Sequence, residues 1–254
     1  MHQILNFTRQ GQPFIIIHGL FGSSRNWQGL AKQFAVHYDV ITLDLRNHGD
    51  SFHADSMDYP LMAADVIALM DQLQLDQAYV LGHSMGGKVA MTLCHEYPQR
   101  FDKLVVADIA PVSYSHDYDD IILPILQMDL ANLANRQQAD QSLASSIADQ
   151  RIRLFLLQNL VFEQGQAHWM LNWPVLQRFM PQITGFADIS DWHVPHPSLF
   201  IRGGLSDYVD ERAWQLIQQH FEQAELVTLP QAGHWLHADK PEAFVDAVVA
   251  FLGK

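Results

Sequence analysis

The chain has 254 residues, of which 48% are hydrophobic and 17% are charged, and its formal net charge is −13. This composition supplies enough apolar material for one large domain with a sizeable core, and it excludes a disordered chain. The negative charge disfavours nucleic acid and anionic membrane surfaces as partners, because both repel an acidic protein.

Six short apolar runs, each ending near a glycine or a polar residue, predict buried strands. The runs lack polar alternation, which is typical of parallel strands that are covered on both faces. In chain order they cover residues 13–19, 39–49, 78–84, 103–111, 197–204 and 224–233.

Helical patterns lie between these runs. Strands that alternate with helices predict a mostly parallel sheet with helices on both faces, an α/β architecture. The clearest helical segments cover residues 59–75, 85–98, 211–221 and 240–252.

The alternation stops between residues 112 and 191, a stretch that is helix-like, contains no clear strand and is too long for a loop. We therefore predict a core made of residues 1–111 and 192–254, with residues 112–191 inserted as a helical cap. Most apolar residues of the cap are expected to form its own core. Four aromatic residues are candidates for lining a substrate pocket: Phe21, Phe162, Trp169 and Trp235.

Polar residues follow several of the predicted strands at their carboxyl ends, where open α/β sheets bind ligands. Ser84 follows the third strand, Asp108 the fourth, Ser206 and Asp207 the fifth, and His234 the last. A serine, acids and a histidine therefore meet at one edge of the sheet. This set of side chains is the one that nucleophilic catalysis by serine needs.

Ser84 lies in the stretch LGHSMGG, between a predicted strand and a predicted helix. The pattern G-x-S-x-G alone is modest evidence, but this context is typical of a serine on a sharp strand-to-helix turn. Gly82 and Gly86 leave room for such a turn. The amino end of the helix at Met85 offers backbone N–H groups to a developing oxyanion. The sequence therefore predicts that Ser84 is a nucleophile.

The motifs HGLFGSSRNW, DLRNHGDS, GHSMGGKVAM and AGHWLHADKPEAF stand in the order and spacing of the α/β-hydrolase superfamily. The resemblance covers nearly the whole chain outside the cap. More narrowly, HGLFGS, DLRNHG, GHSMGGK and DIAPV resemble small bacterial esterases of the YbfF type, which are related to the eukaryotic ABHD-eleven hydrolases. The resemblance implies the α/β-hydrolase fold with a helical cap, and the activity of a serine hydrolase.

The resemblance also implies roles for single residues. His234 stands where the superfamily places its catalytic histidine, and the chain order Ser…Asp…His fits, with His237 as a weaker alternative. The oxyanion hole would use the backbone N–H groups of Leu20 and Met85, and Phe21 is the neighbouring alternative to Leu20.

The acid of the triad has two candidates. Most of the superfamily places it after the strand LFIRGG, but matching Tyr208 and Val209 to the family pattern puts Ser206 in the acid position and Asp207 one residue away. Asp108 directly follows the strand next to that of the nucleophile. In the YbfF-type group the resemblance implies an acid at this DIAP site, with a serine like Ser206 assisting. We predict Asp108, with Asp207 as the alternative.

Other polar residues near these motifs are expected to serve the structure. His18 and His48 would brace loops, Asp44 and Arg46 would shape the loop under the site, and His83 would pack beside the serine. No His, Cys, Asp or Glu cluster has metal-ligand spacing and no phosphate-binding loop is present, so we expect no metal and no cofactor.

The single cysteine, Cys94, forms no intramolecular disulfide and is expected to pack as a small hydrophobe. With no secretory signal and no apolar window of membrane-spanning length, the sequence predicts a cytoplasmic protein.

Together these observations predict a serine carboxylesterase that hydrolyses short- to medium-chain acyl esters through an acyl-enzyme intermediate. An acyl-CoA thioesterase is the nearest alternative, and a C–C hydrolase or perhydrolase would use the same triad. A non-catalytic ligand-binding homologue is the alternative of a different class. We expect a monomer or weak homo-oligomer that acts on a small-molecule ester or thioester, without nucleic acid or membrane partners.

Overall fold

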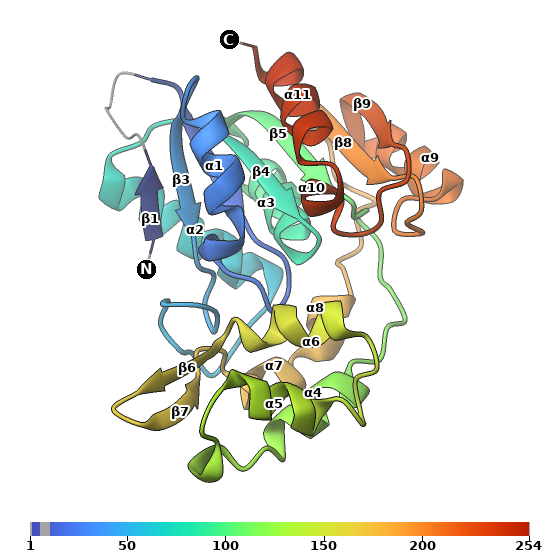
Figure 1. Ribbon diagram of the computed structural model, residues 1–254. Helices are drawn as coiled ribbons and strands as arrows, with labels where there is room; N and C mark the ends of the chain where they lie inside the picture. Colours follow the sequence, from blue (N-terminus) through green and yellow to red (C-terminus); the bar gives the residue numbers. More distant parts are fainter. Residues whose placement is uncertain (1, 6–10, 254) are drawn as a thin grey trace.

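A seven-stranded sheet organises the computed structural model, which describes residues 2–5 and 11–253 (Figure 1). Its strand order is β1-β3-β2-β4-β5-β8-β9, and the strands pair in parallel except β1, which is antiparallel to β3. The strands are β1 (His2–Leu5), β2 (Pro13–Ile17), β3 (Asp39–Leu43), β4 (Ala78–His83), β5 (Phe101–Ala107), β8 (Val194–Gly203) and β9 (Phe221–Leu229).

The six parallel strands correspond to the six predicted runs, and the mostly parallel sheet is confirmed. Along β2, Ile15 and Ile17 belong to one apolar cluster while Phe14 and Ile16 belong to the other, and all four are fully buried. Because neighbouring side chains of a strand point to opposite faces, a strand covered on both sides has no polar positions. The sequence reading missed β1, whose four residues carry no extended apolar run.

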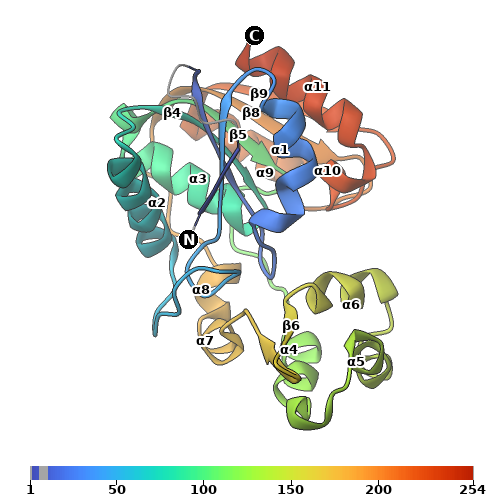
Figure 2. The same cartoon turned by 60° about the vertical axis from the view of Figure 1, so that its left-hand side comes forward.

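Helices cover both faces of the sheet (Figure 2). Asp58 and Asp210 cap the helices α2 (Tyr59–Leu73) and α9 (Glu211–His220), since their carboxylates accept backbone N–H groups of the first turn. The helices α1 (Gln28–Phe34) and α11 (Pro241–Leu252) pack on one face, and α2 (Tyr59–Leu73), α3 (Met85–Glu96) and α9 (Glu211–His220) pack on the other. Shorter helical turns are η1 (Ser24–Trp27), η2 (Pro98–Arg100) and α10 (Leu236–Asp239).

The segment between β5 and β8 forms a separate layer beyond one edge of the core (Figures 1 and 2). The segment contains α4 (Asp119–Leu126), η3 (Leu130–Asn132), α5 (Arg136–Leu143), α6 (Gln150–Leu157), β6 (Leu160–Glu163), β7 (Gln166–Trp169), α7 (Trp173–Arg178) and α8 (Met180–Thr184). We call it the cap, and its boundaries at residues 112 and 191 stay a prediction.

The expectation that the cap contains no strand is wrong, because β6 and β7 form an antiparallel hairpin. Gln164 and Gly165 make the connection, with positive φ angles of 50° and 81°. Such a turn is usually signalled by Asn-Gly or Asp-Gly, and each strand is only four residues long. The sequence signal was therefore too weak to separate this hairpin from the surrounding helices.

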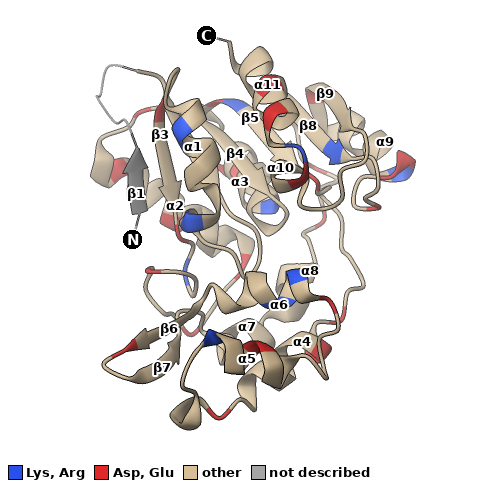
Figure 3. Ribbon diagram, viewed as in Figure 1, with Lys and Arg blue, Asp and Glu red and all other residues tan. Residues whose placement is uncertain are grey.

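Charged residues are scattered over both layers, with Lys and Arg standing singly among more numerous Asp and Glu (Figure 3). Among the described residues, no helix is long and apolar enough to cross a membrane.

Candidate active site

Ser84 lies in the turn between β4 and α3, with φ 53° and ψ −122°. This backbone conformation is rare for an L-residue and costs roughly 1–3 kcal/mol. Its N–H donates to the Ala107 carbonyl at 3.0 Å, and its carbonyl accepts the Gly87 N–H at 2.8 Å. A serine at the start of a helix usually caps it, but here the hydroxyl makes no capping bond and remains available for chemistry.

Glycine is required on both sides of this serine, because three backbone segments are in contact. A Cβ atom on Gly82 would lie 2.0 Å from the carbonyl oxygen of Gly86. A Cβ atom on Gly86 would lie 2.5 Å from the carbonyl oxygens of Ile17 and His18. The loop after β2, the end of β4 and the start of α3 are therefore packed backbone against backbone around Ser84.

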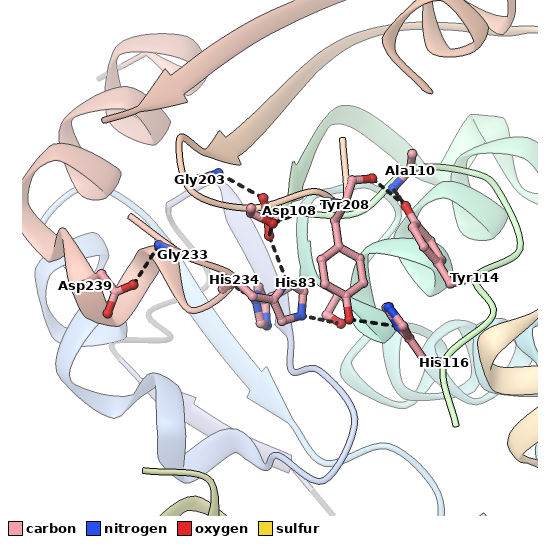
Figure 4. Close-up of polar contacts among 12 residues, drawn as sticks. His83, Asp108, Ala110, Tyr114, His116, Gly203, Tyr208, Gly233, His234 and Asp239 are labelled. Atoms are coloured by element: carbon pink, nitrogen blue, oxygen red, sulfur yellow. Dashed lines mark hydrogen bonds and ion pairs between the residues drawn. The ribbon is translucent and has the colours of Figure 1, made fainter. Parts of the chain in front are cut away.

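Three of the predicted residues form one hydrogen-bonded chain, and Figure 4 labels two of them, Asp108 and His234. The Ser84 Oγ lies 3.0 Å from the His234 Nε2, and the His234 Nδ1 lies 2.8 Å from the Asp108 Oδ2. A neutral imidazole that donates its Nδ1–H to a carboxylate has a free electron pair on Nε2. That nitrogen is placed to accept the hydroxyl proton of the serine.

Asp108 is fully buried at the end of β5, and other groups hold its carboxylate. The Gly203 N–H donates to Oδ1 at 2.9 Å, and the Ser206 hydroxyl donates to Oδ2 at 2.5 Å. With the bond from His234, the carboxylate accepts three hydrogen bonds, which compensates the burial of its charge. Of the two candidate acids, the structure brings Asp108 to the histidine, with Ser206 bonded to Asp108, whereas Asp207 is exposed to solvent.

Two further side chains hold His234 in place. The His83 Nε2 lies 2.8 Å from the His234 carbonyl oxygen, and burial together with the neighbouring His237 and His234 lowers the pKa of His83 well below its ordinary value. Neutral His83 therefore donates one N–H to that carbonyl. The ring of Tyr208 stacks on the His234 ring, with 4.0 Å between the ring centroids (Figure 4). The sequence reading treated His83 as a packing residue and gave Tyr208 no role, because both contacts join distant segments.

The predicted oxyanion donors belong to two segments that adjoin Ser84. Met85 is the first residue of α3, so its N–H has no carbonyl one turn earlier within the helix. Leu20 lies in the loop after β2 and lines the cavities beside Ser84. The N–H of Phe21, the alternative donor, is directed instead to the His48 Nε2 at 3.3 Å.

His18 and His48 brace loops, in agreement with the prediction. The His18 Nε2 accepts the Leu45 N–H at 3.1 Å. Burial lowers the pKa of both rings, that of His48 to about 3, so they accept hydrogen bonds as neutral groups. Asp44 shapes the same region, because its carboxylate accepts the N–H groups of Ser24 and Asp50.

A cavity of about 220 Å³ opens at Ser84 between the core and the cap. Of the four predicted pocket residues, Phe21 and Trp235 line this cavity, whereas Phe162 and Trp169 do not. Phe162 and Trp169 lie on the β6–β7 hairpin, where Phe162 packs against an apolar cluster shared by core and cap, and the ring centroids of Trp169 and Trp173 are 5.6 Å apart. Cap residues that the sequence reading did not single out take their place: Tyr118, Ile121, Ile152 and Phe155.

Within the described residues, no group of His, Cys, Asp or Glu side chains is arranged to hold a metal ion. Cys94 is buried in α3, and burial raises the pKa of its thiol, so a reactive thiolate is disfavoured.

Comparisons with known proteins identify relatives of this chain by sequence and by fold. Residues 12–241 match the family described as alpha/beta hydrolase fold. The esterase YbfF of Escherichia coli is 39% identical over 94% of this chain and 92% of its own length. The mouse sn-1-specific diacylglycerol lipase ABHD11 is 39% identical over 94% of this chain and 80% of its own length. A marine microorganism esterase of known structure superposes with a TM-score of 0.94 at 35% identity, covering 99% of this chain and 98% of that one.

The chain therefore belongs to the α/β-hydrolase family, and the resemblance seen in its motifs is confirmed. Within that family it is a serine hydrolase of the esterase or lipase type, a carboxylic ester hydrolase.

The close backbone contact at Gly82 predicts a strong effect of one added methyl group. Gly82→Ala should lower the free energy of unfolding by about 3 kcal/mol and reduce ester hydrolysis, because the turn must open to admit the Cβ atom. Gly29→Ala is the control, since an added Cβ there meets nothing within 4 Å and α1 gains helix propensity of about 0.5 kcal/mol. Urea unfolding measures both, and a similar change in the two variants would contradict the prediction.

The lowered pKa of the buried His237 should make the protein less stable in acid. Burial and the neighbouring His234 lower its pKa from 6.5 to about 4, and its ring stacks on Trp27 at 4.5 Å. Between these values the unfolded chain binds a proton that the folded protein does not, so the free energy of unfolding falls as the pH falls through this window. The contribution is about 3 kcal/mol, at about 1.4 kcal/mol for each pKa unit. His237→Phe should make this pH dependence shallower in urea unfolding; an unchanged slope would refute it.

Proposed function

We propose that the protein is a carboxylesterase for short- to medium-chain acyl esters, with Ser84 as nucleophile, His234 as base and Asp108 as acid. The observation that carries the proposal is the hydrogen-bonded chain from the Ser84 Oγ through the His234 ring to the buried Asp108 carboxylate, beside an apolar cavity. Serine esterases need this order of groups, because a serine hydroxyl attacks a carbonyl only when an adjacent base takes its proton.

The reaction follows from this arrangement. His234 accepts the Ser84 proton as Oγ attacks the ester carbonyl, and the N–H groups of Leu20 and Met85 stabilise the oxyanion. The imidazolium then gives the proton to the leaving alcohol, and an acyl-enzyme remains. Water enters, His234 takes its proton, and the same steps release the acid. Asp108 keeps the imidazole in the required tautomer and stabilises its charged form.

The size of the cavity supports the substrate range. Its volume of about 220 Å³ lies below the roughly 300–1,000 Å³ of pockets for drug-sized ligands. Its walls carry apolar side chains from both core and cap, including Phe21, Ile121 and Phe155. The relatives reported above are named an esterase and a diacylglycerol lipase, which agree on ester hydrolysis but not on the substrate, so the acyl range rests on the cavity. A cytoplasmic location and a monomeric or weakly associated state stay predictions of the sequence.

The first prediction of this proposal concerns the nucleophile. Ser84→Ala should lower kcat/KM on p-nitrophenyl esters by about 10⁴-fold or more, because no other group forms the acyl-enzyme. The wild type should prefer chains from acetyl to about octanoyl over palmitoyl. Ser190→Ala, at an exposed position of the linker before β8, is the matched control and should keep wild-type rates. Retained hydrolysis in Ser84→Ala would refute the proposal, and faster release of free thiol from acyl-CoA than of alcohol from esters would favour a thioesterase.

The second prediction concerns the acid. Asp108→Asn should lower kcat by about 10³–10⁴-fold, because an amide at this position does not hold the histidine in the productive tautomer. Asp207→Asn should change the rate less than about threefold, since that side chain is exposed one residue away from Ser206. Steady-state kinetics of the pair on one ester decides between the two. A crippled Asp207→Asn enzyme beside an active Asp108→Asn enzyme would reverse the assignment.

A further inference from the structure

Lys88 lies in α3, one helical turn after Ser84, and is buried with 1% of its surface exposed. Its Nζ donates hydrogen bonds to the carbonyl oxygens of Thr184 at 3.0 Å and Gly185 at 2.8 Å. These carbonyls belong to the end of α8, the last helix of the cap, where carbonyls have no partner within the helix. A lysine of the core therefore satisfies the carboxyl end of a cap helix.

Three aromatic rings surround the same ammonium group. The Lys88 Nζ lies 4.9 Å from the ring centroid of Tyr114, 5.4 Å from that of Phe186 and 5.6 Å from that of Tyr59. Ring faces attract a cation at these distances, most strongly where water is excluded. Burial acts in the opposite direction and lowers the pKa of Lys88 to about 7. An apolar side chain would fill this space without that cost, so the position of the amine calls for a reason other than packing.

Other bonds at the same place join the two linkers of the cap to each other and to the core. The Phe186 N–H donates to the Ser113 hydroxyl at 3.0 Å, which ties the outgoing linker to the incoming one. The Tyr59 hydroxyl of α2 donates to the Ile183 carbonyl. With the two bonds of Lys88, the carbonyls of three successive residues at the end of α8 accept from core side chains.

Tyr114 extends these contacts toward the triad. Its N–H donates to the Thr184 carbonyl at 3.0 Å. Its hydroxyl donates to the Tyr208 carbonyl at 2.6 Å and accepts the Ala110 N–H at 3.0 Å (Figure 4). The ring of Tyr208 is the one that stacks on His234. The ring of Tyr114 thus packs on Lys88 while its hydroxyl joins the two loops that carry the acid site.

From these contacts we propose that Lys88 is a positioning residue, whose ammonium group anchors the cap to the helix that begins at the nucleophile. The anchor holds the cap wall of the cavity at a fixed distance from Ser84, and it acts on substrate binding rather than on the chemical step. The kinetic part of this inference rests on the proposed esterase function. The cap wall is formed by Tyr118 and Ile121 on one side and Ile152 and Phe155 on the other.

Loss of the anchor should therefore affect the KM of large and small ester substrates differently. An acetyl ester reaches Ser84 and the oxyanion donors with little contact to the cap wall, whereas an octanoyl ester needs that wall for binding. A displaced cap should therefore raise KM for the larger ester and leave the smaller one almost unchanged. General loss of the fold would instead lower kcat for both.

Lys88→Met tests the anchor, because methionine is nearly as long and carries neither charge nor N–H donor. We expect KM for p-nitrophenyl octanoate to rise about tenfold or more, while kcat on this ester and both constants on p-nitrophenyl acetate stay within about threefold. Lys32→Met is the matched control, since Lys32 is exposed on α1 at the opposite face of the sheet from α3. Equal changes on the two esters, or no change on either, would overturn the proposal.

Phe186→Leu is the second variant, and it decides the question if Lys88→Met does not fold. It removes one ring and keeps the amine with both of its acceptors. We therefore expect KM for p-nitrophenyl octanoate to rise about threefold, with KM for p-nitrophenyl acetate unchanged. Tyr114→Phe serves as a contrast: it keeps the ring over Lys88 and loses the hydroxyl bridge, so it should lower kcat on both esters without changing their KM values differently.

Amide hydrogen exchange separates failure of the anchor from failure of the proposed function, because it needs no substrate. In Lys88→Met, residues 180–186 and α4 should exchange at least about tenfold faster than in the wild type, while β4 and β5 keep their protection. Unchanged exchange in residues 180–186 would overturn the anchor, whatever the esterase assays show. Absent ester hydrolysis in the wild type, with faster exchange in the variant, would refute the esterase proposal alone.

Discussion

The contact of three backbone segments around Gly82 and Gly86 is the constraint on which the rest of the site depends. Because neither position has room for a Cβ atom, the end of β4, the start of α3 and the loop after β2 come together at van der Waals distance. Ser84 is thereby held in a strained turn, beside the loop that carries Leu20 and at the start of the helix that begins at Met85. The proposed nucleophile and the proposed oxyanion donors are thus positioned by main-chain packing, which side-chain rotation does not relax.

The proposed base and the proposed acid reach this turn because parallel strands end at the same edge of the sheet. His234 follows β9 and Asp108 follows β5, and each brings groups that hold it. Asp108 is fully buried, and its carboxylate accepts hydrogen bonds from Gly203 and Ser206 as well as from the histidine. Ser206, which the family resemblance aligns with the usual acid position, donates its hydroxyl to the proposed acid on another strand.

Features whose signal lies within a short stretch of sequence were predictable, and features that depend on contacts between distant segments were not. The apolar runs and the glycines around Ser84 are local signals, so the strands and the turn at Ser84 were predictable. The positions of Asp108 and His234 at strand ends then identified them as candidate partners of the serine. The β6–β7 hairpin escaped because its turn and strands carry weak local signals. The contact of Lys88 with Thr184 escaped for another reason: it joins residues 96 positions apart, and nothing in the α3 sequence specifies which carbonyl a buried amine meets. Phe162 and Trp169 were assigned to the wrong surface, because an aromatic side chain indicates burial but not whether it lines a cavity or packs within the protein.

The division into core and cap separates two properties of the enzyme. Bond making and proton transfer depend on groups that the sheet and its loops fix, whereas the shape of the cavity depends on how the cap sits over them. The buried amine of Lys88 lies at the place where both linkers of the cap meet the core. Burial of the Lys88 amine costs free energy, and its contacts fix the position of the cavity wall without altering the triad. Substitutions that remove a ring from around that amine would accordingly change the substrate range before they change the reaction chemistry.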